Sequence, residues 1–227
     1  MTKEPLLITG GCSNSDQACT DYDIGVIVWP TLVAKTLSME LLNVAKIGAS
    51  NDHIENAVFD AILENHKHRD IRVMVFWTGS NRVNLFDEQT LGEDKYELFH
   101  FDQKNVINKS FRNIKRLDQV CRSLNIPCHH RIGIGFASNT HLSEDLLEWL
   151  RNHEALKEFN FSYYEAFTGR WSSKNEGAHA NLALETGHPN QKGQDDIAQM
   201  FIDTMNNIPL GTLEIQPDLI EDNFIYD

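Results

Sequence analysis

The sequence predicts a three-layer α/β/α sandwich around a parallel sheet, formed by all 227 residues as a single domain. Three observations predict this fold. Short apolar runs alternate with segments of helical periodicity along the chain, which is typical of a parallel sheet covered on both faces. The run IRVMVFW (71–77) is continuously apolar and β-branched, as central parallel strands are. Residues 54–62 place apolar side chains at helical spacing, which predicts an amphipathic helix.

The other elements of the first half follow from similar patterns. A short strand is expected at 4–11 before a Gly-rich turn, a helix at 29–37 and a second strand at 40–46. Ser50 to Asp52 are good N-caps for the helix that includes residues 54–62. Residues 82–101 are irregular, acidic and aromatic, and we expect a long loop there.

The second half continues the alternation. One long helix is expected to end at Asn125 and Pro127, with an apolar face made by Ile107, Phe111, Ile114, Leu117, Cys121 and Leu124. A fourth strand is expected at 126–135, a helix from Ser143 to about residue 155, and a fifth strand at 159–167. A polar loop at 168–189 precedes a last helix at 190–205, and an acidic tail begins near residue 208, which either docks or frays.

Composition excludes several classes of partner. The net charge of −13 argues against nucleic-acid and anionic-membrane partners, because both need a basic surface. No apolar run is long enough to span a bilayer, and the N-terminus lacks the pattern of a signal peptide, so a cytoplasmic location is expected. Cys12, Cys19, Cys121 and Cys128 lack C-x-x-C spacing, which favours free thiols in a reducing compartment. No metal motif, dinucleotide fingerprint or Walker loop is present, so neither a metal nor a cofactor is expected.

Candidate functional residues follow the predicted strands or lie in the last loop. Ser13 comes in the Gly-rich turn after the first strand, Gly48 after the second and Asn81 after the third, while Glu185 and His188 lie in the polar loop. Ligands of such sheets bind at the carboxyl ends of the strands. Covalent ester hydrolysis needs a hydroxyl nucleophile, a base, a group that orients the base, and donors for the oxyanion. These five residues are of the right types, although Cys12 remains an alternative nucleophile.

The order of these residues resembles the SGNH hydrolases, also called the GDSL esterase/lipase superfamily. Their Gly-Asp-Ser block is matched by residues 11–13, their glycine turn after an Asn-containing strand by 43–48, and their Gly-x-Asn-Asp block by 79–82. Their final Asp-x-x-His-Pro block, followed by a glycine and a helix, is matched by 185–189 and Gly193. The Gly-Cys-Ser opening, a downstream Trp-Pro and the GASND turn look most like the compact members encoded by phages and bacteria.

This resemblance implies a flavodoxin-like sheet and a role for each residue. Ser13 would be the nucleophile, His188 the base and Glu185 its partner, and the N–H groups of Ser13 and Gly48 with the amide of Asn81 would form the oxyanion hole. The chain departs from the pattern at three positions. Cys12 replaces an Asp that supports the local turn in the family, Arg82 replaces the Asp after Asn81, and Glu185 replaces an Asp. Arg82 places a cation where an acidic substrate could bind.

The expected function is therefore hydrolysis of small acyl esters, such as acetyl groups on a carbohydrate or small metabolite. The acetyl preference is an analogy with compact relatives that are deacetylases. One alternative is a thioesterase or lysophospholipase of the same fold. The other is a non-catalytic carbohydrate-binding or structural protein that keeps the fold, virion-associated if a phage encodes it.

Overall fold

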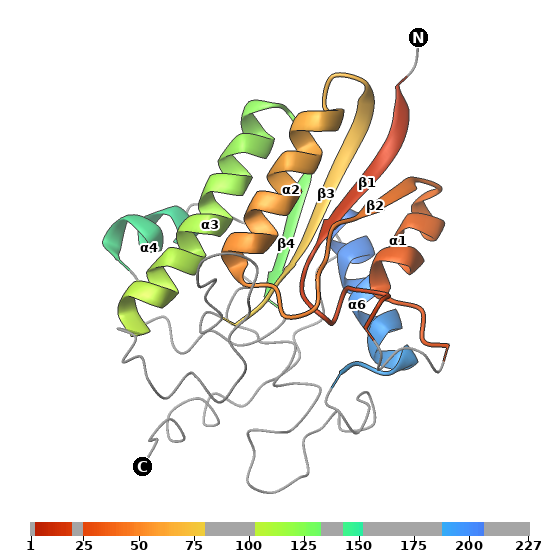
Figure 1. The fold of residues 1–227 in the computed structure, drawn as a ribbon. Coiled ribbons are helices and arrows are strands. Elements are labelled where there is room, and N and C mark those ends of the chain that lie inside the picture. Colours follow the sequence, from red (N-terminus) through yellow and green to blue (C-terminus); the bar gives the residue numbers. More distant parts are fainter. Residues whose placement is uncertain (1–2, 20–24, 80–102, 133–142, 152–187, 207–227) are drawn as a thin grey trace, which may run out of the picture.

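The structure is a computed structural model, and it describes residues 3–19, 25–79, 103–132, 143–151 and 188–206. Its centre is an all-parallel sheet in the order β2-β1-β3-β4 (Figure 1). The strands are β1 (Glu4–Gly10), β2 (Glu40–Asn43), β3 (Arg69–Trp77) and β4 (Cys128–Ile132). Each pair of neighbours runs parallel, with β1 between β2 and β3. This confirms the parallel sheet that the sequence predicts.

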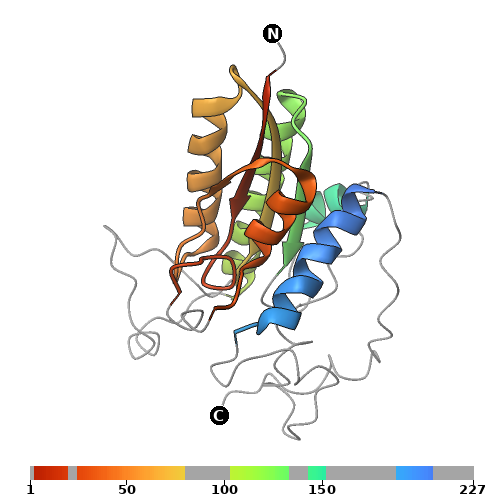
Figure 2. The same cartoon turned by 90° about the vertical axis from the view of Figure 1, so that its right-hand side faces the viewer.

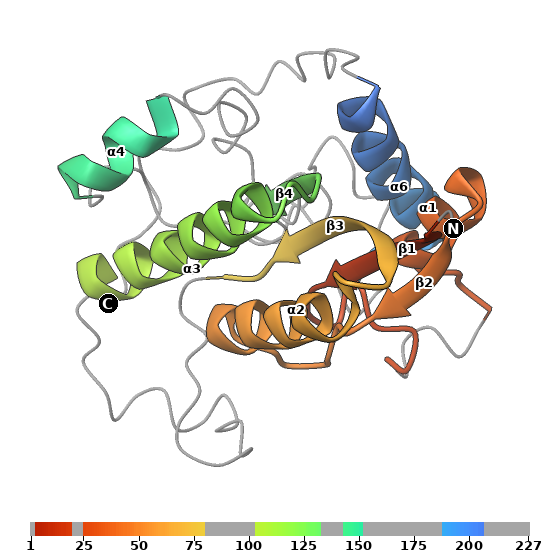
Figure 3. The same cartoon turned by 90° about the horizontal axis from the view of Figure 1, so that it is seen from above.

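Helices cover both faces of the sheet, which gives the predicted three layers (Figures 2 and 3). One face is covered by α1 (Trp29–Leu37) and α6 (Gln191–Met205), and the other by α2 (Asn51–Asn65) and α3 (Gln103–Ser123). The short helix α4 (Glu144–Arg151) packs beside α3. Alternation along the strands divides the core: Leu7, Met74 and Phe76 pack against α1 and α6, whereas Leu6, Ile8, Val73 and Val75 pack against α2 and α3.

Helix ends follow the capping residues in the sequence. The Ser50 side chain accepts a hydrogen bond from the backbone N–H of His53 at the start of α2, and Asn190 accepts one from Gly193 at the start of α6. After α3, Asn125 adopts a left-handed φ of 55° and the N–H of Ile126 bonds back to the carbonyl of Cys121 at 2.8 Å. The cap at Ser50 confirms the start expected for α2, and the caps at Asn190 and Asn125 lie within two residues of the ends expected for α6 and α3.

The prediction that Leu124 is a core residue is wrong. Leu124 was expected on the apolar face of α3, but the helix ends at Ser123 and Leu124 is 37% exposed. The left-handed turn at Asn125 reverses the chain before another helical turn can form, so the periodic spacing no longer places Leu124 over the sheet. The loop at 82–101, the strand at 159–167, the end of the helix expected to reach residue 155 and the tail from 208 lie outside the described residues. The single-domain organisation of the whole chain therefore stays a prediction.

The strand order places a topological switch point between β1 and β3. The chain leaves β1 toward β2 on one side, and leaves β3 toward β4 on the other. In open α/β sheets, ligands bind beyond the carboxyl ends of the strands at such a point. Ser13 follows β1 directly, so the fold places it at this position. Within the described ranges, no helix is both long enough and apolar enough to cross a membrane.

Candidate active site

The structure brings Ser13 and His188 together. Ser13 lies in a turn after β1, in which the N–H of Ser15 bonds to the carbonyl of Cys12 at 2.9 Å. His188 lies just before α6, and its Nε2 is 2.9 Å from Ser13 Oγ. When Nδ1 carries the ring proton, Nε2 accepts the hydroxyl proton of Ser13, which is the arrangement of a nucleophile and its base. Ser13 is only 6% exposed, whereas His188 is half-buried.

The turn that carries Ser13 requires glycine at position 11. A Cβ on Gly11 would lie 2.2 Å from Ser15 Oγ and 2.7 Å from Ser15 Cβ. Ser15 cannot easily yield, because its Oγ accepts a hydrogen bond of 2.9 Å from Trp29 Nε1 and both residues are buried. The glycine of the Gly-Cys-Ser opening is therefore a packing requirement of the turn.

Gly48 lies in a second turn, beside the first. The N–H of Ala49 bonds to the carbonyl of Lys46 at 3.0 Å, and Gly48 has a φ of +73°. A positive φ at the third residue only is the geometry of a type II turn, which favours glycine there. Within the described part of the chain, the N–H groups of Gly48 and Ser13 donate to no protein acceptor.

Hydrogen bonds join the two turns. The carbonyl of Gly11 accepts from the N–H of Lys46 at 3.2 Å. Asp16 Oδ2 accepts from the N–H of Ile47 at 3.1 Å, while its Oδ1 accepts from the N–H of Ala18 at 2.9 Å. The Asp16 carboxylate thus holds the residue before Gly48. Sequence reasoning missed Asp16; its only signal was an acidic residue three positions after Ser13.

Asn43 supplies a further link at the end of β2. Its Nδ2 donates to the carbonyl of Ser15 at 2.7 Å, and its Oδ1 accepts from Thr9 Oγ1 at 3.0 Å and from the N–H of Ala45 at 3.2 Å. Asn43, the last residue of β2, therefore ties the turn of Ser13 to β1 and β2. This is a physical reason for an asparagine in the strand before the glycine turn.

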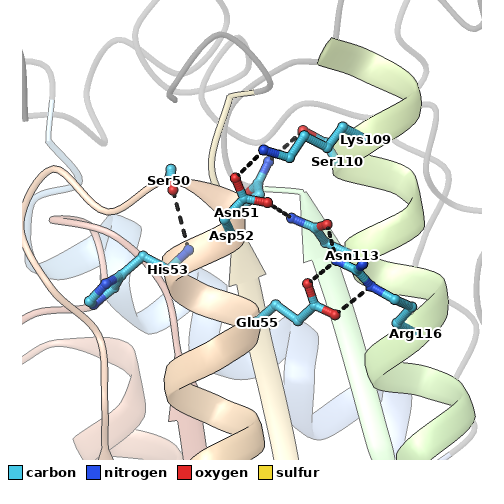
Figure 4. A network of polar contacts seen from close by, with 9 residues as sticks. All are labelled: Ser50, Asn51, Asp52, His53, Glu55, Lys109, Ser110, Asn113 and Arg116. Atoms are coloured by element: carbon cyan, nitrogen blue, oxygen red, sulfur yellow. Dashed lines mark hydrogen bonds and ion pairs between the residues drawn. The ribbon is translucent and has the colours of Figure 1, made fainter. Parts of the chain in front are cut away.

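Three of the predicted site residues, Asn81, Arg82 and Glu185, lie outside the described residues, and their roles stay predictions. The segment that leads to Asn81 is nevertheless anchored. Asn51 donates through Nδ2 to the carbonyl of Thr78 at 3.0 Å and to Ser110 Oγ at 3.1 Å, and its Oδ1 accepts from the N–H of Thr78 at 3.0 Å. Figure 4 draws Asn51 with its partner Ser110. Asn51 therefore ties the end of β3 to the helices α2 and α3.

The alternative nucleophile Cys12 occupies a different environment from Ser13. Its side chain is 1% exposed and packs in the core on the side of α2 and α3. Since Ser13 Oγ makes the contact with His188, the geometry favours Ser13 over Cys12 as the nucleophile.

A cluster of histidine and cysteine side chains, separate from the contact between Ser13 and His188, lies between α3 and β4. His130 Nδ1 accepts a hydrogen bond of 3.1 Å from Trp77 Nε1, so the ring proton of His130 is on Nε2. That Nε2 lies 3.3 Å from Cys128 Sγ and 3.9 Å from Asp118 Oδ1. A protonated Nε2 can neither bind a metal nor remove a thiol proton. Burial raises the pKa of the Cys128 thiol, and the Cys121 thiol raises it further. Across the described ranges, no group of His, Cys, Asp or Glu side chains is arranged to hold a metal.

Comparisons with known proteins give matches among solved structures only. No protein-family model matches the chain, and no curated protein sequence matches it. A protein from Desulfitobacterium hafniense described as lipolytic and of the G-D-S-L family is 14% identical, with a TM-score of 0.50, over 86% of this chain and 95% of that one. The structure of TesA is 14% identical, with a TM-score of 0.50, over 89% and 99%.

A GDSL-like lipase from Bacteroides thetaiotaomicron is 11% identical, with a TM-score of 0.50, over 90% of this chain and 88% of that one. At such low identity the likeness concerns the arrangement of helices and strands, and it extends over most of each chain. The chain therefore has the fold of the GDSL, or SGNH, lipolytic proteins and lipases.

Proposed function

We propose that this protein is a serine ester hydrolase that releases small acyl groups, such as acetyl, from a carbohydrate or small metabolite. The observation that carries the proposal is the 2.9 Å contact between His188 Nε2 and Ser13 Oγ, beyond the carboxyl end of β1 at the switch point of the sheet. The N–H groups of Ser13 and Gly48 have no acceptor among the described residues, which supports the second requirement of acyl transfer, a set of donors for the oxyanion.

The chemistry follows from this arrangement. His188 removes the hydroxyl proton as Ser13 Oγ attacks the ester carbonyl, and a tetrahedral intermediate forms. The N–H groups of Ser13 and Gly48, with the amide of Asn81, stabilise the negative oxygen. The His188 imidazolium then gives its proton to the leaving alcohol, with its charge supported by Glu185. Water, activated by the same imidazole, cleaves the acyl-enzyme, and Ser13 recovers its proton.

The substrate class rests on two supports. The fold is shared with proteins described as lipolytic and as lipases, which favours an ester bond. The preference for a short acyl group is an analogy with the compact deacetylases that the sequence resembles. In this proposal Arg82 binds an acidic group of the substrate.

The test combines active-site labelling with a substrate series. The wild-type protein should react with a fluorophosphonate at Ser13 and should hydrolyse p-nitrophenyl acetate faster than the long-chain esters. Ser13→Ala should abolish both, whereas Cys12→Ala should retain most of the activity. Labelling that persists in Ser13→Ala and disappears in Cys12→Ala would reverse the assignment of the nucleophile. A wild-type protein that neither reacts nor hydrolyses any ester or thioester, yet binds carbohydrate, would favour the non-catalytic alternative.

A further inference from the structure

The contact between Ser13 and His188 joins two segments that lie 175 residues apart in the sequence. Side-chain packing alone leaves such a distance free to vary by fractions of an ångström. A misplacement of about 1 Å at a reacting pair can cost roughly a hundredfold in rate. The structure should therefore contain a specific connection between the turn of Ser13 and the segment of His188.

Gln194, in the first turns of α6, makes that connection. Its side chain is completely buried, with 0% exposure. Its Nε2 donates to the carbonyl of Asn14 at 3.1 Å, and its Oε1 accepts from the N–H of Trp29 at 2.8 Å. One side-chain amide thus bonds to the residue after Ser13 and to the first residue of α1, from a helix that begins directly after the segment of His188.

Trp29 strengthens the same connection. Its indole N–H donates to Ser15 Oγ at 2.9 Å, so the turn of Ser13 is held at two successive residues. The Trp29 ring also stacks on Phe201 of α6, with ring centroids 4.4 Å apart. The turn, α1 and α6 therefore form one packed unit, and Gln194 contributes its central polar contacts.

We propose that Gln194 is a positioning residue that sets the distance between Ser13 and His188. This proposal rests on the proposed function. The side chain at position 194 must donate to the Asn14 carbonyl and accept from the Trp29 N–H at the same time. A glutamine amide supplies both, an ionised glutamate supplies only the acceptor, and methionine supplies neither although its size is similar.

The chain offers a matched control in Gln191, one helical turn earlier. Its amide bonds to both main-chain groups of Ile27, accepting at 2.8 Å and donating at 3.4 Å, and these contacts lie near solvent. Gln191 therefore ties the same helix to the segment before α1, and among the described residues its side chain makes no hydrogen bond with the turn of Ser13. Replacing it tests whether loss of any glutamine at the start of α6 is sufficient to lower activity.

The experiment compares Gln194→Met with Gln191→Met in steady-state ester hydrolysis and in the rate of fluorophosphonate labelling. For Gln194→Met, kcat and the labelling rate should fall by about tenfold to a hundredfold, with KM changed by less than about threefold. Gln191→Met should keep kcat within about threefold of wild type. Equal losses in the two variants, or an unchanged kcat in Gln194→Met, would overturn the proposal.

A second readout does not depend on activity. The ¹⁵N chemical shift of His188 Nε2 reports its hydrogen bond with Ser13 Oγ, and Ser13→Ala gives the shift without that bond. Gln194→Met should move the resonance toward the Ser13→Ala value, while Gln191→Met should leave it in place. If the wild-type protein hydrolysed no ester, this measurement would still test the positioning role by itself. If Gln194→Met fails to fold, Gln194→Leu removes the same two contacts, and an Nε2 shift equal to wild type in that variant would refute the role.

Discussion

Replacing Asn51 should destabilise the protein through three identified hydrogen bonds. Asn51 is 2% exposed at the start of α2, and its side chain bonds to both main-chain groups of Thr78 and to Ser110 Oγ. Thr78 is itself buried just beyond β3, so water cannot easily replace these bonds. Asn51→Ala leaves the three partners without the contacts that they make in the native protein.

The magnitude follows from the number and burial of these bonds. A typical intramolecular hydrogen bond contributes about 1 kcal/mol net, and an unsatisfied buried partner costs about 1–3 kcal/mol. Three bonds therefore correspond to a loss of about 3 kcal/mol in the free energy of unfolding. For a chain of this size, 1 kcal/mol lowers Tm by about 2–4 °C, so the expected decrease is about 6–12 °C.

The assay is urea and thermal denaturation followed by circular dichroism. Asn56→Ala is the matched control, since Asn56 is an exposed residue of the same helix and this change should alter the stability by less than about 0.5 kcal/mol. A loss below about 1 kcal/mol in Asn51→Ala, or one equal to that of the control, would refute the reasoning.

A variant with an ionisable group at position 51 tests the direction in which stability changes with pH. Asn51→Asp keeps an acceptor for the N–H of Thr78 but loses both donations, and burial should raise the pKa of the new carboxyl above that of an unfolded Asp. The protonated form is then the one that the folded state tolerates. Stability relative to wild type should therefore improve as the pH falls through the raised pKa and worsen as it rises.

Two further predictions concern the site and the pH dependence of folding. Asp16→Ala should lower kcat about tenfold to a hundredfold by loosening the turn of Gly48, with a stability loss below about 1.5 kcal/mol because the carboxylate lies near solvent; an unchanged kcat would show that the turn holds without it. Burial, with the nearby charges of Arg131 and Arg72, lowers the pKa of His129 to about 4. Because an unfolded histidine binds its proton near 6.5, the free energy of unfolding should decrease as the pH falls from about 6.5 to about 4. His129→Gln should flatten that decrease in urea titrations, and an identical slope would assign it to other groups.

Elements with a strong local signal could be predicted from the sequence. The continuous apolar run at 71–77 and the caps Ser50, Asn190 and Asn125 all specify their structure within a few residues of the chain. The start of β3 could not be read in this way. The strand begins at Arg69, outside the apolar run, because Arg69 pairs in register with Glu4 of β1. That pairing depends on another strand and leaves no apolar signal.

Some residues of the candidate site could likewise be predicted from the sequence, and others could not. Ser13 and His188 could be proposed because their neighbours form short motifs, and the structure places the two side chains in contact. Asp16, Asn51 and Gln194 could not, because each bonds to main-chain atoms of a distant segment. The two residues joined by the Gln194–Asn14 bond, for example, are 180 positions apart. Any residue type can supply a main-chain carbonyl or N–H, so the identity of the bonding partner cannot be recognised from the sequence.

The packing of α6 has a consequence for how the protein is made. Leu7, Met74 and Phe76 are covered on one face by α1 and α6, and α6 begins only at Gln191. Ribosomes add about 5–20 residues per second, so roughly ten seconds separate the synthesis of Phe76 from that of α6. During this interval the growing chain presents a partly uncovered apolar face to other nascent chains and to chaperones. The turn of Ser13 likewise acquires its contacts with His188 and Gln194 only after those residues have been synthesised.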